Sequence, residues 1–298
     1  MSENTPPICD YEGSDYQTSF WEQGGRAYED AVEEIALTRL LPPRGDFLLE
    51  LGAGAGRNTP RYQNFSRITL VDYSRTQLVQ ARQRLGDSHR YLYVAADIYS
   101  LPFVEGLFDA ATMIRTLHHM ANPDLALSQT HRVMRPEGIF ILEFANKRNL
   151  KSIFRFILGK QEWNPFSQDQ VEFVHLNFDF HPKAIRRSLR VNGFDIEKQL
   201  TVSHFRTEFL KHHIPHAILV KLDSLLQWTG SWIQVSPSVF SRCRVLGGQI
   251  AAGDQIFQCP QCHTPLAGVE SALHCDHCDA TYPYQDGIYD FRLITEQE

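Results

Sequence analysis

Short apolar runs alternate with stretches of helical periodicity along the first half of the chain. The five runs are rich in Leu, Ile, Val and Phe, and they cover residues 46–52, 68–74, 91–97, 108–114 and 138–144. Runs of this composition are typical of strands that are buried on both faces. Between them, residues 76–85 and 123–134 predict helices, the first beginning after a capping Ser74 and ending at Gly86. The alternation predicts an α/β fold with a parallel sheet and right-handed crossovers.

The same alternation continues, more widely spaced, in the second half. Residues 182–192 predict a helix, and the runs 194–205 and 238–246 predict two strands that complete the sheet. The long stretch between the fifth strand and the last one, residues 147–235, is expected to form a lid over the substrate.

Residues 147–160 predict a basic amphipathic helix. Apolar side chains recur at helical spacing, as Leu150, Ile153, Phe154, Ile157 and Leu158. Cations surround this stripe, as Lys147, Arg148, Lys151, Arg155 and Lys160. We expect the stripe to pack on the domain as part of the lid. The alternative is peripheral contact with anionic lipid, or gating of an apolar acceptor pocket.

Charge is distributed unevenly over the 298 residues, whose net charge is -6. Residues 147–221 hold thirteen Lys and Arg against seven Asp and Glu, a local net of +6, whereas residues 251–298 hold eight acids against Arg292 alone, a local net of -7. This asymmetry indicates a basic surface for an anionic substrate, or docking of the two regions on each other, unless both are simply solvated.

Neither a secretory signal nor a membrane span is predicted. Residues 1–13 are polar and lack an apolar core, and no apolar run reaches the ~18 residues that a transmembrane helix requires. With 43 % hydrophobic and 21 % charged residues the chain has the composition of a packed globular protein. We therefore expect a cytoplasmic protein.

A glycine-rich loop, LLELGAGAGR at residues 48–57, joins the first predicted strand to the helix that follows it. Such a loop lies at the carboxyl end of a parallel sheet, where α/β folds bind their ligands. A dinucleotide fingerprint would require glycine at position 57, which is Arg57 here. The carboxylate of Glu50 would repel a pyrophosphate and attract an ammonium group.

This E-x-G-x-G-x-G pattern resembles the loop of class I S-adenosylmethionine (SAM)-dependent methyltransferases of the type 11-like group, and the later motifs follow in that family's order. The resemblance implies a Rossmann-like, seven-stranded, mostly parallel sheet within residues 1–250. It also implies that Asp72 accepts hydrogen bonds from both ribose hydroxyls, with Tyr73 against the adenine, which Asp97 and the Ile98 N–H would bind. The other cofactor residues that it implies are Glu50, Gly52, Ala53, Gly54 and Arg115.

The reaction needs a general base only if the methyl acceptor must lose a proton. His118 and His119 follow the fourth strand, near the expected acceptor, and His118 is our candidate base; a histidine that only bonds to backbone there is the alternative. Residues 114–117 read I-R-T-L instead of the Asp/Asn-Pro-Pro-aromatic loop of enzymes that methylate adenine or glutamine amides, which argues against those acceptors. Tyr11, Tyr16 and Trp21 resemble the family's aromatic amino-terminal cover.

Two C-x2-C pairs, separated by twelve residues, predict a four-cysteine zinc site near the carboxyl end. The ligands would be Cys259, Cys262, Cys275 and Cys278. A disulfide framework is the alternative, which a cytoplasmic location disfavours. A unit as small as residues 255–293 buries too little apolar surface to fold without the metal.

The full carboxyl-terminal pattern, ending in Y-P-Y-Q-D-G-I, is similar to a small zinc-binding family that activates methyltransferases as a separate subunit. The resemblance implies a zinc ribbon fused to its own enzyme, with a structural or regulatory role.

Together these features predict methyl transfer from SAM to a small-molecule acceptor, apolar or anionic. Methylation of rRNA or tRNA is the alternative, although the acidic ribbon is unsuited to a polyanion, which Lys and Arg bind. A further alternative is a catalytically silent fold that serves as a scaffold.

Overall fold

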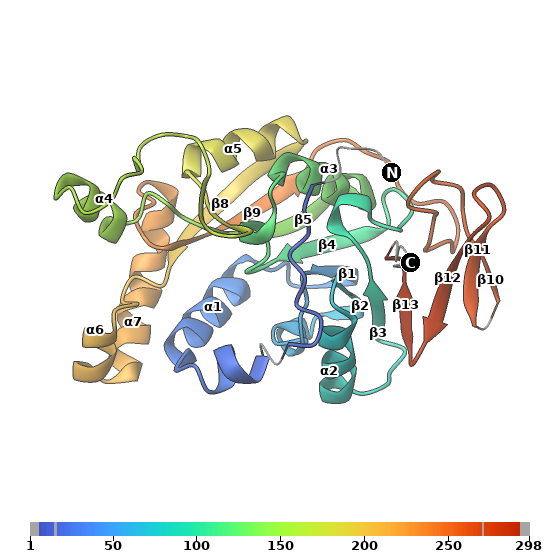
Figure 1. The fold of residues 1–298 in the computed structure, drawn as a ribbon, viewed down its shortest axis with the longest axis horizontal. Coiled ribbons are helices and arrows are strands. Elements are labelled where there is room, and N and C mark those ends of the chain that lie inside the picture. Colours follow the sequence, from blue (N-terminus) through green and yellow to red (C-terminus); the bar gives the residue numbers. More distant parts are fainter. Residues whose placement is uncertain (1–5, 15–16, 270, 293–298) are drawn as a thin grey trace.

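The computed structural model describes residues 6–14, 17–269 and 271–292, and seven strands form its central sheet in the order β3-β2-β1-β4-β5-β9-β8 (Figure 1). They are β1 (Gly45–Leu51), β2 (Phe65–Asp72), β3 (Tyr91–Ala95), β4 (Phe108–Met113), β5 (Met134–Ala145), β8 (Phe194–Val202) and β9 (Ser238–Val245). The first five pair in parallel, and β9 runs antiparallel to both β5 and β8. The predicted α/β fold with a seven-stranded, mostly parallel sheet is confirmed.

Helices cover both faces of this sheet. They are α1 (Ala27–Leu40), α2 (Arg75–Leu85), α3 (Pro123–Val133), α5 (Pro182–Val191) and α7 (His216–Leu226). The predicted caps are present, because the Ser74 side chain accepts a hydrogen bond from the Gln77 N–H and α2 ends at Gly86. Successive residues of β1 enter different cores, with Leu48 on one face and Leu49 on the other, which explains why the strand is an unbroken apolar run.

Single turns of helix occur at several loops, and most of them lie at the carboxyl edge of the sheet. They are η1 (Gln17–Glu22), η2 (Thr59–Arg61), η3 (Ile98–Ser100), η4 (Leu117–His119) and η5 (Gln227–Ser231). Within the described ranges no helix is long and apolar enough to cross a bilayer.

Four further strands, at the carboxyl end of the chain, lengthen the sheet to eleven strands. They are β10 (Ala267–Val269), β11 (Ala272–Cys275), β12 (Ala280–Gln285) and β13 (Ile288–Asp290). β13 pairs in parallel with β3, with Tyr289 opposite Val94, so the cysteine-bearing region continues the sheet (Figure 1). The pairing satisfies the backbone groups of an edge strand that would otherwise stay open.

Residues 147–235, predicted to form the lid, contain segments that are additional to the central fold as well as elements that belong to it. The added segments are α4 (Leu150–Ile157), the hairpin of β6 (Val171–Val174) and β7 (Asn177–Asp179), and α6 (Glu208–His213), whereas α5 and β8 belong to the central fold. The expectation that the apolar stripe of α4 packs on the domain is wrong. Phe154 is 60 % exposed and Ile157 68 %, because none of the described elements covers that side of the helix.

Candidate functional site

A cavity opens at the carboxyl ends of β1, β2, β3 and β4. Its walls come from the loops after these strands and from the amino-terminal residues Ile8, Cys9 and Tyr11. The loop residues are Gly52, Gly54, Asp72, Tyr73, Gln77, Ala96, Asp97, Ile98, Tyr99, Arg115, Thr116, His119 and Met120. Seven of the nine predicted cofactor residues therefore line one cavity, and the other two, Glu50 and Ala53, do not.

The first glycine of the loop is required by a close approach of the chain to Thr116. Gly52 has φ +67°, and a Cβ built there would lie 2.1 Å from Thr116 Oγ1. The Thr116 hydroxyl in turn shares its proton between the carbonyl oxygens of Leu51 and Ile114, at 3.2 and 3.1 Å. Gly54 also has a positive φ, but a Cβ there would meet only Gln77 Oε1, at 3.8 Å. The loop therefore wraps tightly around Thr116 while its second glycine faces open space.

Glu50 lies beneath the loop instead of in the cavity lining. Its carboxylate is buried and accepts a hydrogen bond of 2.6 Å from the Thr59 hydroxyl. Burial raises the pKa of Glu50 to about 7, although Arg57 and Arg61 oppose the shift. The structure thus places this carboxylate in support of the loop, and Ala53 has a similar role because its backbone N–H bonds to Val71 O at 3.0 Å.

Asp72 and Asp97 close the ends of two neighbouring strands and face the same cavity. The Asp72 carboxylate accepts from the backbone N–H groups of Gly54 and Ser74, at 2.8 and 2.9 Å. Asp97 accepts from the Tyr99 N–H at 2.8 Å and caps η3. Burial raises the pKa of Asp72 to about 6 and also raises the pKa of Asp97. Both aspartates therefore accept hydrogen bonds from nearby backbone N–H groups and also line the cavity.

One buried acceptor in this wall has no partner among the described residues. Gln77 is 2 % exposed, and its Oε1 makes no hydrogen bond, although its Nε2 donates to Ser14 O at 2.9 Å. A buried carbonyl oxygen without a donor is costly, so this atom fits a ligand that brings an N–H or O–H into the cavity. Sequence reasoning missed Gln77 because it reads as an ordinary position in the first turn of α2.

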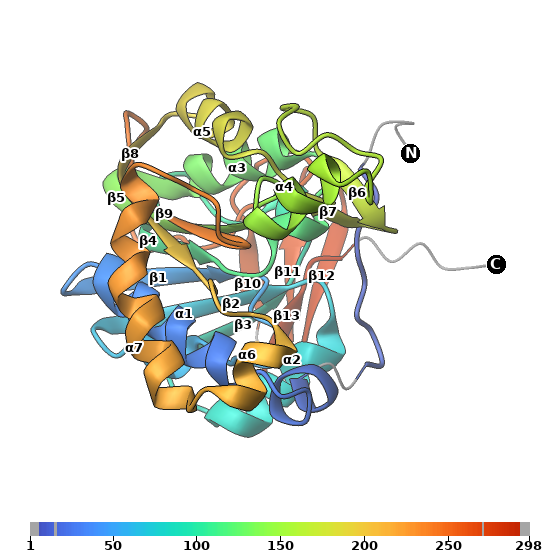
Figure 2. The same ribbon diagram turned by 90° about the vertical axis from the view of Figure 1, so that its left-hand side faces the viewer.

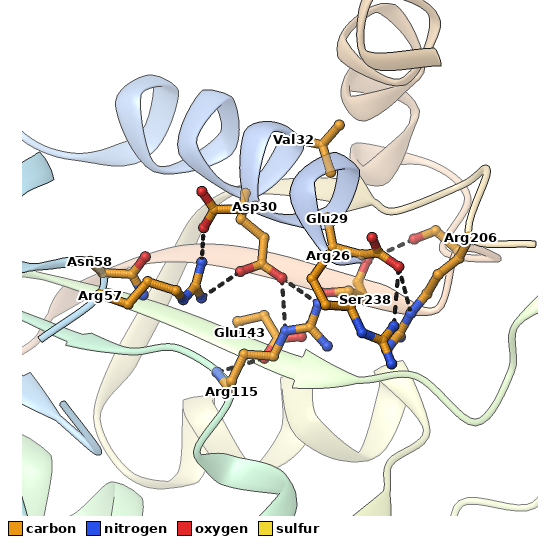
Figure 3. Close-up of polar contacts among 12 residues, drawn as sticks. Arg26, Glu29, Asp30, Val32, Arg57, Asn58, Arg115, Glu143, Arg206 and Ser238 are labelled. Atoms are coloured by element: carbon orange, nitrogen blue, oxygen red, sulfur yellow. Dashed lines mark hydrogen bonds and ion pairs between the residues drawn. The ribbon is translucent and has the colours of Figure 1, made fainter. Parts of the chain in front are cut away.

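Arg115 is held in a strained conformation by a buried charge network that begins on α1 (Figure 3). Its φ is +59°, its N–H donates to Glu143 Oε2 at 2.9 Å, and its Nε donates to Glu33 Oε1 at 2.7 Å. Glu33 also receives Arg57 Nη2 at 2.8 Å. Burial alone would raise the pKa of Glu33, but the guanidinium groups of Arg115 and Arg57 outweigh it and lower that pKa. The ion pairs keep this wall charged and fixed.

His119 and not His118 lines the cavity. His119 Nδ1 donates to Leu176 O at 3.1 Å, which leaves Nε2 to accept from the Tyr11 hydroxyl at 3.1 Å. His118 packs its ring on His119, with 3.9 Å between the ring centroids, and burial lowers the pKa of His118 well below its usual range.

The aromatic residues predicted to cover the site lie in different places. Tyr11 lines the cavity, as predicted, whereas the Trp21 ring stacks against the Arg57 guanidinium, with 3.5 Å from the ring centroid to Cζ. Tyr16 lies outside the described residues.

The four cysteines of the carboxyl-terminal region come together as the spacing predicts. Their Sγ atoms all lie within 4.8 Å of one another, with 4.0 Å between Cys259 and Cys278 and 3.5 Å between Cys262 and Cys275. A tetrahedral Zn²⁺ with Zn–S bonds of about 2.3 Å places its sulfur ligands about 3.8 Å apart, so the cluster fits zinc. The Tyr282 hydroxyl lies 3.3 Å from Cys259 Sγ, in position to donate to a thiolate.

Contacts between the carboxyl-terminal region and the cavity run through the end of β13. The Phe291 N–H donates to Ala95 O at 2.7 Å, directly after the strand pairing. Arg292 then bonds to Glu12 at 3.0 Å and to the backbone oxygen of Tyr73 at 3.4 Å. Glu12 itself accepts from the Arg75 N–H at the start of α2. The region thus braces both the Tyr73 side of the cavity and the amino-terminal segment that covers it.

Other known proteins contain a segment that is similar in sequence to the first half of this chain. Residues 49–142 match the family described as "Methyltransferase domain". A demethylmenaquinone methyltransferase from Clavibacter sepedonicus is 33 % identical over 119 residues, which are 39 % of this chain and 49 % of that protein. The O-methyltransferase cnsE from Penicillium expansum is 28 % identical over 150 residues, 47 % of this chain and 54 % of that protein. A 27-O-demethylrifamycin SV methyltransferase from Amycolatopsis mediterranei is 29 % identical over 134 residues, 42 % of this chain and 49 % of that protein. The chain spans about half the length of these curated relatives.

Solved structures extend the likeness of the fold beyond the matched sequence. A chain from a complex between a methyltransferase activator and a methyltransferase of Haloferax volcanii has a TM-score of 0.55 at 15 % identity, over 78 % of this chain and 96 % of that one. An S-adenosylmethionine-dependent methyltransferase structure from Listeria monocytogenes has a TM-score of 0.53 at 16 % identity, over 74 % and 99 %. At these identities the likeness establishes the fold alone.

Proposed function

We propose that this chain, whose residues 49–142 match a methyltransferase domain, transfers a methyl group from SAM to a small-molecule acceptor. The observation that carries the proposal is the cavity in which Gly52, Gly54, Asp72 and Asp97 meet at the carboxyl ends of three adjacent strands. Carboxylates there suit the hydroxyl and amine donors of a nucleoside, and Gln77 Oε1 offers a further buried acceptor. The relatives that match this domain are named for small molecules, demethylmenaquinone and demethylrifamycin among them.

The residues around the cavity serve alignment and the exclusion of water. A sulfonium methyl group is already electrophilic, so the enzyme mainly orients the acceptor in line with the carbon–sulfur bond. Tyr11 and Cys9 cover one side of the cavity, and His119, fixed by Leu176 and Tyr11, presents an imidazole on another. Nε2 of His119 accepts from the Tyr11 hydroxyl in this arrangement, so it could take a proton from a hydroxyl acceptor only in place of that hydrogen bond.

The carboxyl-terminal region acts in this proposal as a built-in activator that binds zinc. Two observations support the role: the four-cysteine cluster, and the brace from Arg292 to Glu12 and Tyr73. A chain of the Haloferax volcanii complex between a methyltransferase activator and a methyltransferase shares the fold of this chain. Fusion would make permanent a contact that separate subunits form by association.

The test incubates the zinc-loaded chain with SAM labelled in the methyl group and, separately, with small-molecule, lipid and RNA fractions of cells. We expect SAM to bind in calorimetry and label to enter the small-molecule or lipid fraction. Label confined to RNA would establish the alternative acceptor. If the chain keeps its zinc but does not bind SAM, the result would show that the chain is a catalytically silent scaffold and not an enzyme.

The affinity for SAM is expected to fall at acidic pH because of Asp72. Burial raises the pKa of Asp72 to about 6, and ribose hydroxyls donate to the carboxylate but not to a protonated oxygen. Binding should therefore be independent of pH above about 7 and weaken by about tenfold per unit below about 6. Calorimetry across this range measures it. Asp72→Asn should bind weakly at every pH with a flatter profile, and an equally steep profile in Asp72→Asn would contradict the assignment.

Substitution of the two neighbouring histidines should have unequal effects on turnover. His119→Gln removes the imidazole that lines the cavity, and we expect kcat to fall by about tenfold or more if the acceptor loses a proton, with unchanged affinity for SAM. His118→Gln is the matched control, for which we expect less than about a threefold change. A larger loss in His118→Gln than in His119→Gln would restore His118 as the candidate base.

A further inference from the structure

Three segments that are separate in the chain expose apolar side chains, and two of them, α4 and β6, lie on the same side of the molecule (Figure 2). We call the apolar surface of these segments the α4 face. Its exposed apolar side chains are Leu150, Phe154, Ile157 and Leu158 on α4, Phe173 and Val174 on β6, and Trp232 and Ile233 in the loop after η5. Trp232 is 83 % exposed, which is unusual for the largest apolar side chain. An apolar patch of this extent on a globular protein marks an interaction surface.

Hydrogen bonds hold two of these segments side by side while their apolar side chains stay uncovered. The Leu150 N–H donates to Val235 O at 2.9 Å, and the buried Asn146 amide donates to Gln234 O and Ser236 O at 3.2 and 2.8 Å. The Asn149 side chain caps α4 by accepting from the Ser152 N–H. The helix is therefore well formed and anchored, and its exposed stripe is a built feature of the fold.

The same side of the molecule carries an excess of positive charge. Residues 147–190 hold nine Lys and Arg against four Asp and Glu. Eight of these cations lie on or beside α4 and α5 and form no ion pair with any residue in the described ranges. They are Arg148, Lys151, Arg155, Lys160, Lys183, Arg186, Arg187 and Arg190. Burial and the nearby charges of Arg190 and Arg148 lower the pKa of Arg186, which shows how closely these cations are gathered.

The α4 face is also connected to the cavity. The β6–β7 hairpin exposes Phe173 and Val174 near its turn, and two residues later Leu176 is buried and accepts the hydrogen bond from His119. After β7, Phe180 pairs with Asn146 at the end of β5. A single hairpin thus runs from the exposed apolar surface to the acceptor side of the cavity.

We propose that the α4 face docks on the surface of an anionic lipid bilayer, with the apolar side chains in the acyl boundary and the cations against the headgroups. Leu, Ile and Phe at helical spacing with flanking Lys and Arg are the composition of an interfacial helix. Aliphatic side chains gain nothing from a nucleic acid, which binds through cations and stacked aromatics. Docking on a membrane would give the proposed methyltransferase access to an apolar acceptor dissolved in the bilayer. The identity of this acceptor rests on the proposed function, whereas docking itself does not require SAM.

The experiment sediments the full zinc-loaded chain with vesicles of phosphatidylcholine alone and of equal parts phosphatidylcholine and phosphatidylglycerol. We expect binding to the anionic vesicles to exceed binding to the neutral ones by at least about tenfold and to weaken in high salt. Lys151→Glu with Arg155→Glu, and separately Phe154→Ser with Ile157→Ser, should each reduce binding by at least about tenfold. Arg44→Glu and Ile250→Ser, both exposed and outside the α4 face, should bind like the parent chain.

Three results would overturn the proposal. The first is absence of binding to anionic vesicles by a chain that binds SAM, which would leave the proposed function intact. The second is strong competition by RNA together with unchanged binding of the Phe154→Ser, Ile157→Ser variant, which would assign the face to nucleic acid. The third is a dimer in light scattering that the same variant converts to a monomer, which would assign the face to a second copy of the chain.

Discussion

Replacing Cys275 by serine should abolish zinc binding and unfold the carboxyl-terminal region, with the largest loss of stability of any single change in this chain. Cys275 is fully buried beside the other three sulfur atoms, so the change to serine leaves the cluster with three thiolates. A structural zinc supplies about 10 to 16 kcal/mol of apparent binding free energy, and a region of this size has little core of its own to replace it. Metal content by mass spectrometry and mapping of proteolytic cleavage sites measure both effects.

Loss of the region should also weaken the binding of SAM, because β13 would detach from β3 and Arg292 would leave Glu12 and Tyr73. Arg292→Ala separates this brace from the metal, since it should keep zinc and still bind SAM more weakly in calorimetry. Cys243→Ala is the control: this cysteine is equally buried but lies in β9, outside the cluster, so zinc should stay at one ion per chain. Full zinc content in Cys275→Ser would contradict the four-sulfur site.

Replacing Gly52 by alanine should destabilise the central domain by about 2–4 kcal/mol, the sum of a positive φ and an overpacked contact. The new Cβ would lie 2.1 Å from Thr116 Oγ1 and 2.8 Å from Thr116 Cβ, so either the loop or Thr116 must move. Because both residues line the cavity, binding of SAM should weaken by at least about tenfold. Thermal unfolding and calorimetry measure the two effects.

Gly54→Ala provides a matched control in the same loop. Gly54 also has a positive φ, but a Cβ there would meet only the end of Gln77, at 3.8 Å, so the change should cost about 1 kcal/mol of stability. Thr116→Ala combined with Gly52→Ala should restore part of the stability, because it removes the two nearest atoms and leaves the third. Equal destabilisation by the two single alanine variants would show that φ alone, and not the contact with Thr116, makes glycine necessary at position 52.

Local patterns in the sequence were sufficient for the succession of strands and helices along the chain, the glycine loop and the cysteine cluster. A strand buried on both faces must be apolar throughout, and a tetrahedral metal site needs its ligands in closely spaced pairs, so both leave a signal within a few neighbouring residues. The resemblance to the methyltransferase family pointed to Asp72 and Asp97, and their positions at the ends of β2 and β3 place them at the carboxyl edge of the parallel sheet.

The tertiary structure decided which of these residues face the cavity and what surrounds them. Glu50 lies two residues before the lining residue Gly52, and His118 lies directly before the lining residue His119. Packing nevertheless turns Glu50 toward Thr59 and places His119, not His118, in the wall. The place of Gln77, Ile8 and Cys9 in the cavity wall and the exposure of the α4 stripe were equally hidden. Periodicity shows that a helix has an apolar side, but whether another element covers that side depends on contacts between distant parts of the chain, and local sequence does not encode those contacts.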